Sequence, residues 1–420
     1  MDTVKVSVVL PTYKNEEYLV QCIESILNQT LEDIELIVVD EGDLDRGREI
    51  IDYYEKADPR VKSIHEKNGG YGKSVNKGFA IAQGEYWAIV EADDFLEPTM
   101  YQELYEYAKR LGADVVKSSF YEHFPNGKRI YSRHEYLNNH LPSNRTFTLI
   151  EFPQFIATHP SIWGGIYKAS FMKENDIHCV EAKGAGYIDG VFRLDVMMNA
   201  KRIAWLNNPL YNYRLTNEAA SSAPANYNLS AMLHRWSEVH ERLSKRQKLR
   251  DIIGPFLARE EYVNTIEWIY GKGKTCTEDD LKLLKQNLVY VEENYIRSAP
   301  ILTEQEKSIM LGFKNNVDLF VKQSKRHMNI SKYKNYIREI TVKLTSFKMI
   351  GIFSCALIVF VPFTIAFYIG AYDFLLLGNS RYIVNILLSV VSLLFLIVTV
   401  SCLFLKVLYK GYKFWKFKRR

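Results

Sequence analysis

The fold is decided by one stretch of the sequence, Gly84-Glu85-Tyr86-Trp87-Ala88-Ile89-Val90-Glu91-Ala92-Asp93-Asp94-Phe95-Leu96-Glu97-Pro98. The apolar run from Tyr86 to Val90 predicts a buried strand. Pro98 predicts the first turn of the following helix, because proline lacks only an N–H that has no partner at that position. The stretch therefore reads as a strand, a short acidic loop and the start of a helix.

Three carboxylates, Glu91, Asp93 and Asp94, follow this strand within four residues. Because like charges at such spacing repel each other, the cluster indicates a bound cation or another ligand. Hard oxygen ligands favour Mg²⁺ or Mn²⁺, which commonly share their coordination with a diphosphate. The alternative is an acidic loop before a helix whose first turn favours negative charge.

Short apolar runs alternate with helical patterns on both sides of this stretch, from Lys5 to about Ser119. Strands are predicted at Lys5–Leu10, Ile34–Val39, Val61–His65, Tyr86–Val90 and Asp114–Ser119. Helices are predicted at about Glu17–Asn28, Arg48–Lys56, Ser74–Ala82 and Pro98–Leu111. Such alternation predicts an α/β fold with a mainly parallel sheet, and ligands of such sheets bind at the carboxyl ends of the strands.

Composition and charge limit the partners of the protein. The chain has 420 residues, which suggests two or three domains, and a formal net charge of +5. Its basic residues gather near the C-terminus, which favours an anionic membrane surface over nucleic acid. The five cysteines are scattered without C-x-x-C spacing, so neither a disulfide framework nor a zinc site is expected. The first apolar run is too short for a signal peptide.

The C-terminal third predicts a membrane anchor. Helical periodicity with many charges runs through residues 226–345, and two nearly uncharged segments follow at about 349–369 and 383–405. Each is long enough to span a bilayer as a helix. Lysine and arginine flank the pair on both sides, so the positive-inside rule predicts a hairpin with both termini in the cytoplasm. Two buried core helices are the alternative.

Two further strand ends carry polar residues. Pro11, Thr12 and Tyr13 follow the first strand, where an aromatic ring could stack on a base. Asp40 and Glu41 follow the second strand, where a carboxylate could accept hydrogen bonds from a base or a ribose. Both segments are also compatible with N-caps of the helices that follow them.

A glycine-rich loop opens the third helix with Gly69-Gly70-Tyr71-Gly72-Lys73-Ser74. Backbone N–H groups at such a helix start can bind phosphate. The P-loop pattern of nucleotide-dependent phosphotransferases requires glycine at position 67, which is Lys67 here. That enzyme class is therefore disfavoured.

Taken in order, these motifs resemble the family 2 glycosyltransferases, which have the GT-A fold. Residues Val4 to about Ser222 carry the resemblance. The matching segments are Pro11-Thr12-Tyr13-Lys14-Asn15-Glu16, Val39-Asp40-Glu41-Gly42-Asp43, Asn76-Lys77-Gly78, and Glu91-Ala92-Asp93-Asp94 in place of the metal-binding Asp-x-Asp-Asp. In the family's Glu-Asp pair before a helix, this chain keeps Asp189 and has Ile188 for the glutamate.

The resemblance implies a role for each matching residue. Asp189 is the implied general base, and its alternative role is the N-cap of a helix at Gly190–Ala200. Asp93 and Asp94 are the implied ligands of Mg²⁺ or Mn²⁺, and Trp163 and Arg214 are implied at the acceptor, with a core aromatic and a structural ion pair as their alternatives. The implied nucleotide-sugar contacts are Pro11, Thr12, Tyr13, Glu16, Asp40, Glu41, Lys73, Asn76, Glu91, Ala92 and Asp93.

The resulting expectation is a GT-A domain at residues 1–225, a helical extension at 226–345 and a transmembrane hairpin at 346–420. The expected activity is an inverting, metal-dependent transfer of one sugar from a nucleoside diphosphate sugar, with a UDP-sugar favoured, to a lipid-linked glycan in cell-surface polysaccharide assembly. The catalytic domain is expected on the cytoplasmic side of the cell membrane. The Glu91 and Ile188 departures leave a second possibility, a catalytically inactive, membrane-anchored binding protein.

Overall fold

The computed structural model describes residues 4–322 apart from 43–45, 68, 125, 132–140, 183–186, 216–227, 272–275 and 320. The chain divides into two compact units, Met1–Lys325 and Arg326–Arg420. The boundary expected near residue 225 therefore falls inside the first unit. Both segments predicted to span a membrane lie outside the described residues. Among the helices that the described residues form, none combines the length and the apolar character needed to cross a bilayer.

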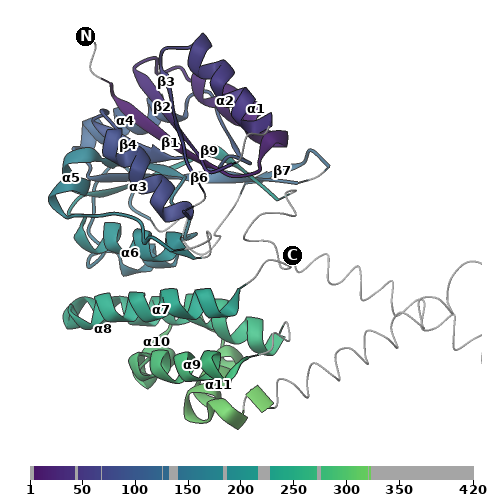
Figure 1. Cartoon of the computed structure of the whole chain (residues 1–420). Helices are drawn as coiled ribbons and strands as arrows, with labels where there is room; N and C mark the ends of the chain where they lie inside the picture. The colour runs from purple at the N-terminus through teal and green to yellow at the C-terminus, as the bar shows by residue number, and fades with distance from the viewer. Residues whose placement is uncertain are drawn as a thin grey trace, which may run out of the picture. The chain divides into compact units, whose positions relative to one another are not determined.

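One mixed sheet forms the centre of the first unit (Figure 1). Its described strands are β1 (Val6–Thr12), β2 (Ile34–Asp40), β3 (Val61–His65), β4 (Tyr86–Ile89), β5 (Phe95–Leu96), β6 (Val115–His123), β7 (Arg129–Tyr131), β8 (Gly165–Lys168) and β9 (Ile203–Arg214). They lie in the order β3-β2-β1-β4-β8-β6-β9-β5, and β7 pairs with β6. The α/β prediction is confirmed.

The direction of the strands brings their carboxyl ends to one edge. Strands β1 to β4 are parallel to one another, and β8 is antiparallel to both β4 and β6. Two antiparallel steps restore the direction, so β6 and β9, which are parallel to each other, run the same way as β1. The ends of β1, β2, β3, β4 and β9 therefore lie along the same edge of the sheet.

The central strands are apolar throughout because both faces of the sheet are covered. Every residue of β1 and β2 is buried. Successive side chains of a strand point to opposite faces. Accordingly Val8 and Leu10 contribute to one apolar cluster, whereas Val9 contributes to the other. This two-sided burial explains why the strands read as continuous apolar runs rather than as an alternating pattern.

Helices α1 (Glu16–Leu27), α2 (Arg46–Ala57), α3 (Tyr71–Ile81) and α4 (Met100–Leu111) connect the strands of the N-terminal half. The prediction that Pro98 lies in the first turn of α4 is wrong, because the helix begins at Met100 with Thr99 as its N-cap. The backbone of Pro98 accepts a hydrogen bond from the N–H of Thr30 at 2.9 Å, which holds this residue in the preceding turn.

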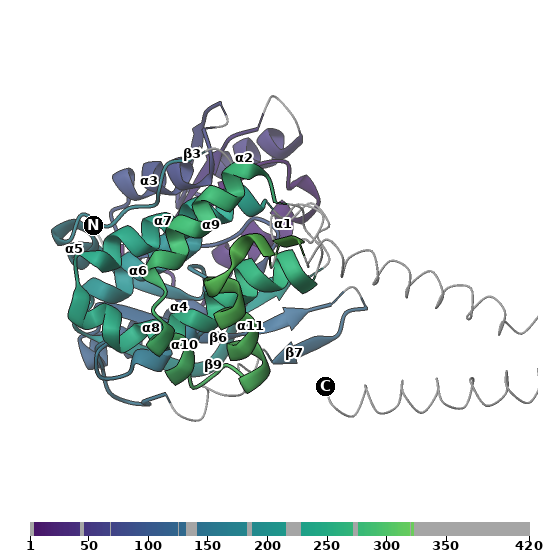
Figure 2. The same cartoon turned by 90° about the horizontal axis from the view of Figure 1, so that it is seen from below.

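The remaining helices extend one face of the sheet into a second layer. They are η1 (Pro153–Ala157), α5 (Ala169–Glu174), α6 (Ile188–Asn199), α7 (Leu229–Ser244), α8 (Gln247–Glu261), the π-helix η3 (Tyr262–Gly271), α9 (Glu278–Tyr290), α10 (Glu293–Ser298) and α11 (Glu304–Asn315). Helix α6 lies between the sheet and α7, and the view from below shows α7 to α11 across the same face (Figures 1 and 2).

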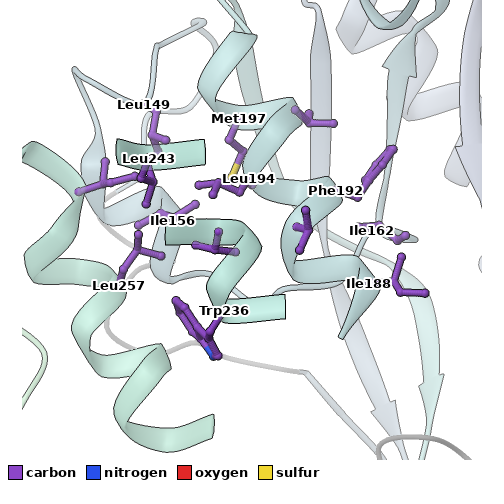
Figure 3. Packing of buried hydrophobic residues seen from close by; sticks show 14 of the residues in the cluster. Leu149, Ile156, Ile162, Ile188, Phe192, Leu194, Met197, Trp236, Leu243 and Leu257 are labelled. Atoms are coloured by element: carbon purple, nitrogen blue, oxygen red, sulfur yellow. The ribbon is translucent and has the colours of Figure 1, made fainter. Parts of the chain in front are cut away.

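A single apolar cluster runs from the sheet into these helices. It contains Val9 of β1, Phe192 of α6, Trp236 of α7 and Met310 of α11. Figure 3 shows α6 side chains such as Leu194 and Met197 packed beside Trp236, Leu243 and Leu257 of α7 and α8. The helical extension therefore completes the core of the GT-A-like part instead of forming a core of its own.

Candidate functional site

Polar residues from three neighbouring strands meet at the carboxyl edge of the sheet. In the strand register, Thr12 of β1 lies opposite Asp40 of β2, and Asp40 lies opposite His65 of β3. Pro11 and Thr12 are buried in β1, and the next residue, Tyr13, has 43% of its surface exposed. The sequence prediction that these strand ends lie together is confirmed, and Tyr13 has an accessible ring.

The acidic turn after β4 is held in place by β9. The carboxylate of Asp94 is fully buried, and its oxygens accept hydrogen bonds from the backbone N–H of Arg214 at 2.7 Å and from the hydroxyl of Tyr211 at 2.8 Å. Asp93 is only half-buried, and its backbone carbonyl accepts a hydrogen bond from Nε of Arg214 at 2.6 Å. The two predicted metal ligands therefore differ in environment: Asp94 anchors the turn, and the metal-binding role of Asp93 stays a prediction.

Burial and neighbouring negative charges raise the pKa of two carboxyl groups in the acidic turn, Glu91 and Asp94. Burial, together with the charges of Asp93 and Asp189, raises the pKa of Glu91 to about 8 against the lowering effect of the hydrogen bond from Tyr71. Burial, with the charge of Asp93, also raises the pKa of Asp94 well above its ordinary value. A bound cation would relieve this repulsion, and a set of hard carboxylate oxygens fits Mg²⁺ or Mn²⁺. Within the part of the chain that the structure describes, however, no three His, Cys, Asp or Glu side chains already form a metal site.

Asp189 lies in the first turn of α6. The helix begins at Ile188, and Tyr187 precedes it in a left-handed conformation with φ 59°. Asp189 is therefore not the N-cap, which was the alternative interpretation. Burial raises the pKa of Asp189 to about 6, against the lowering effects of the Gly190 N–H and the Arg193 guanidinium. Its charge acts on Glu91, so the base candidate and the acidic turn belong to one site.

The glycine-rich loop connects α3 to the acidic turn. Gly70 has φ 101°, which glycine adopts without strain, and the hydroxyl of Tyr71 donates to Oε1 of Glu91 at 2.6 Å. A Cβ on Gly72 would lie only 2.0 Å from the carbonyl oxygen of Val180, so the segment before α6 packs directly on the start of α3. Lys73 lies in this first helical turn, and its proposed diphosphate contact stays a prediction.

Asn76 does not present its amide to a ligand. Its Nδ2 donates to the carbonyl of Cys179 at 2.9 Å and to Oε1 of Glu181 at 3.1 Å, and its Oδ1 accepts from the N–H of Cys179 at 2.8 Å. These contacts correct the predicted nucleotide-sugar role of Asn76, because its hydrogen-bonding groups already hold the segment before α6.

Asp40 and Glu41 hold the backbone near the predicted base site. Asp40 accepts hydrogen bonds from the N–H of Gly42 at 2.8 Å and from Nε of Arg48 at 3.0 Å, and Nδ1 of His65 lies 2.9 Å from its Oδ2. Glu41 accepts from the N–H of Gly69 at 2.9 Å. Their direct contact with a base or ribose stays a prediction, as does that of Glu16, which is half-buried at the start of α1.

Trp163 is a core residue. Only 5% of its surface is exposed, and its ring stacks on Tyr211 with 4.1 Å between the ring centroids and on Tyr213 with 5.3 Å. The prediction that Trp163 stacks on an acceptor sugar is therefore wrong, because aromatic side chains already cover the indole ring. Tyr211 in turn donates to Asp94, so this aromatic stack supports the acidic turn.

Arg214 lies beside the acidic turn. Its guanidinium donates to the backbone carbonyl of Asp93 and to Oε1 of Gln21 at 2.7 Å, and it lies over the ring of Tyr18 at 4.7 Å. These partners of the guanidinium are uncharged groups. Its contact with an acceptor stays a prediction.

Three residues of this site were missed by sequence reasoning. Tyr71 and His65 stood inside motifs already singled out, and their positions at a helix start and a strand end were the available signal. Arg193 gave no signal, because nothing in its surrounding sequence indicates that it is 4% exposed and acts electrostatically on Asp189.

Known proteins resemble the chain over this region. The family model for glycosyl transferase family 2 matches residues 7–174. The uncharacterized glycosyltransferase EpsJ of Bacillus subtilis is 32% identical over 52% of this chain and 63% of its own length. Glycosyltransferase GlyG of Streptococcus pneumoniae is 41% identical over 28% of this chain and 40% of its own length. The chain thus spans less than two thirds of these relatives.

A solved structure supports the same fold. TarS 1–349 of S. aureus, determined in complex with UDP-GlcNAc, superposes with a TM-score of 0.60 at 20% sequence identity, covering 79% of this chain and 92% of the TarS 1–349 chain. At that identity the likeness establishes the fold alone, which is the GT-A-like sheet followed by helices. The order of the motifs, the fold and the family match agree, and residues 7–174 of the chain are similar to glycosyl transferase family 2.

Proposed function

We propose that this protein transfers one sugar from a nucleoside diphosphate sugar to a hydroxyl group with inversion at the anomeric carbon, in a reaction that depends on Mg²⁺ or Mn²⁺. The observation that carries the proposal is the pairing of two acidic elements at one edge of the sheet. Asp189, at the start of α6, lies within electrostatic reach of Glu91 in the turn that contains Asp93. One element suits a general base, and the other suits a metal-bound diphosphate.

The proposed reaction forms one bond and breaks another. The acceptor oxygen attacks the anomeric carbon, the bond from that carbon to the diphosphate oxygen breaks, and the hydroxyl proton passes to the carboxylate of Asp189. A general base works best when its pKa is near the operating pH, and the pKa of about 6 for Asp189 fits this requirement. A divalent ion held by Asp93 would neutralise charge on the departing diphosphate.

The proposed binding partners are inferred from the sequence and from the proteins that this chain resembles. Tyr13 would stack on the base, and Asp40 and Glu41 would hold the loops around it. A UDP-sugar is the proposed donor, since the fold neighbour TarS was solved with UDP-GlcNAc. A lipid-linked glycan is the proposed acceptor, and the segments at about 349–369 and 383–405 would anchor the enzyme in the cell membrane with the catalytic domain and both termini in the cytoplasm.

The decisive experiment replaces the proposed base. The full chain is extracted in detergent, its donor is selected by thermal shift from a panel of nucleoside diphosphate sugars with Mn²⁺, and release of the nucleotide is then followed. Asp189→Asn is expected to lower kcat at least about a hundredfold, because general-base catalysis contributes on that order. Asp195→Asn is the matched control, since Asp195 lies on the same helix and pairs with Arg242.

The parent enzyme is also expected to lose activity as the pH falls through about 6, because Asp189 becomes protonated there. Unchanged turnover in Asp189→Asn would remove the proposed base. Donor binding without turnover in the parent, across the whole panel, would instead favour the inactive binding protein.

A further inference from the structure

Helix α6, which carries Asp189, is joined to the helical extension by a buried ion pair. Arg193 lies four residues after Asp189, which is about one helical turn. Its Nη2 lies 2.6 Å from Oε2 of Glu260 near the end of α8. The Arg193 side chain is 4% exposed and that of Glu260 is 18% exposed. The pair therefore lies in a largely dry environment, where charges interact more strongly than at the surface.

Arg193 also holds the C-terminal end of η1 through the other terminal nitrogen of its guanidinium. Its Nη1 donates to the carbonyl of Ile156 at 2.8 Å and to the carbonyl of Thr158 at 2.9 Å. Since a guanidinium is planar, these contacts and the bond to Glu260 fix its plane. Glu260 and the two carbonyls together thus fix the position of the Arg193 charge, which lowers the pKa of Asp189.

We propose, on the basis of the function proposed above, that Glu260 is a positioning residue for Asp189 that acts through Arg193, and that the helical extension is thereby part of the catalytic apparatus. The role is specific to this pair. Other polar contacts also join α6 to α7 and the start of α8. Arg242 pairs with Asp195 at 2.8 Å, and Arg246 donates to the carbonyl of Met198 at 2.9 Å and to Asn199 at 2.7 Å. All of these contacts lie farther along α6 from Asp189.

The charged groups around Asp189 determine whether its pKa rises or falls when Glu260 is replaced. The groups that interact electrostatically with Asp189 are Arg193 of α6, Glu260 of α8, Glu91 after β4, Lys117 of β6, Tyr71 of α3 and Cys179. Arg193 lowers the pKa of Asp189, and Glu260 raises it. Removing the charge of Glu260 therefore lowers the pKa of Asp189 and makes it a weaker base.

Apolar packing explains how the ion pair of Arg193 and Glu260 can affect the position of Asp189. Figure 3 shows Ile188, Phe192 and Leu194 of α6 in the same packed cluster as Ile156 of η1 and Leu257 of α8. Close-packed side chains move together. A change in the angle of the Arg193 guanidinium at this interface is therefore passed to the first turn of α6, where Asp189 lies.

The test compares Glu260→Gln with Arg242→Gln in the full chain in detergent. Release of UDP from the UDP-sugar selected in the panel is measured with Mn²⁺ between pH 5 and pH 8. We expect Glu260→Gln to lower kcat by between about tenfold and a hundredfold with an unchanged donor KM, because a small misplacement of the base lowers turnover on that scale. The acid limb of the profile moves to lower pH by about half a unit or more. Arg242→Gln retains the parent profile.

Two conservative variants complete the design. Glu260→Asp keeps the charge and is expected to keep the acid limb within about 0.2 units of the parent. Arg193→Lys keeps a charge but loses the planar contacts to two carbonyls, so kcat falls with an unchanged donor KM. If Glu260→Gln does not fold, these two variants still measure the role of the pair.

A Glu260→Gln profile that matches Arg242→Gln, or parental turnover in Arg193→Lys, overturns the inference. Its failure is separable from that of the proposed function. Loss of turnover in Asp189→Asn together with a parental Glu260→Gln profile refutes the positioning role alone. Parental turnover in Asp189→Asn refutes both.

Discussion

Asp93 and Asp94 are adjacent in the sequence, yet the chain places them in different environments. Asp94 is fully buried, and two donors from β9 use its oxygens. Asp93 is half-buried at the same turn. A buried carboxylate with donors on both oxygens maintains backbone geometry, whereas a partly exposed one can exchange its ligands. The two residues should therefore respond differently to the same substitution.

We predict that Asp94→Ala lowers the free energy of unfolding by about 1–3 kcal/mol for each donor left without its acceptor. Asp93→Ala should instead leave the free energy of unfolding within about 1 kcal/mol of the parent, because it lies at a partly exposed position. The same variant should abolish the thermal shift that UDP gives with Mn²⁺. Denaturant unfolding and a Mn²⁺ titration with and without EDTA measure these effects. A preserved metal-dependent shift in Asp93→Ala would contradict the assignment.

At the scale of elements, α3 packs directly against the segment before α6, and this contact is called the joint below. The side chain of Asn76 makes hydrogen bonds to both the carbonyl and the N–H of Cys179. Because Gly72 has no side chain, the carbonyl of Val180 can approach the helix closely. Tyr71, at the start of the same helix, donates to Glu91. The joint thus links the start of α3 to Glu91 and to the segment before α6.

We predict that Gly72→Ala lowers the free energy of unfolding by about 1–3 kcal/mol, because its methyl group would overlap the Val180 carbonyl and force the segment away. Turnover should fall as the start of α6 shifts. Gly312→Ala in α11 is the matched control, since a Cβ there meets nothing within 4 Å. The control should gain about 0.5–1 kcal/mol from helix propensity. Equal stability and turnover in both variants would count against the joint.

The sequence predicted local elements well and long-range contacts poorly. The strand at Val61–His65 was predicted at its observed bounds, because turn signals stand on both sides of it, Asp58-Pro59 before it and Asn68-Gly69-Gly70 after it. The same reasoning assigned equal metal roles to Asp93 and Asp94, since Tyr211 and Arg214 lie 117 and 120 residues after Asp94. Trp163 was misassigned for the same reason, because its stacking partners follow much later in the chain.

At the scale of the whole molecule, the helices after residue 225 complete the core of the sheet. The cluster that begins with Val9 extends through Leu233 and Leu257 to Phe313. Arg193 of α6 finds its carboxylate partner in α8. The expected GT-A domain and the described part of its helical extension share one compact unit that ends at Lys325. The expected domain bounds stay a prediction. Sequence periodicity marked the change from strands to helices but carried no information about which faces pack together.

This organisation gives a prediction for truncated chains. A chain of residues 1–325 should unfold in one cooperative transition, because it retains the whole cluster. A chain of residues 1–225 should lack a cooperative transition, since α6 would expose Phe192, Leu194 and Met197, each worth about 1.5–3 kcal/mol when buried. It would also leave Arg193 without Glu260 in a partly apolar environment.

Thermal unfolding followed by near-UV circular dichroism distinguishes the two truncated chains, with size-exclusion chromatography as a check for aggregation. Binding of UDP with Mn²⁺ then tests whether the carboxyl edge of the sheet is intact. A chain of residues 1–225 that unfolds cooperatively and binds UDP like residues 1–325 would show that the helical extension is dispensable for the site. It would also remove the structural ground for coupling Glu260 to Asp189, because that coupling requires α6 to depend on α8 for its position.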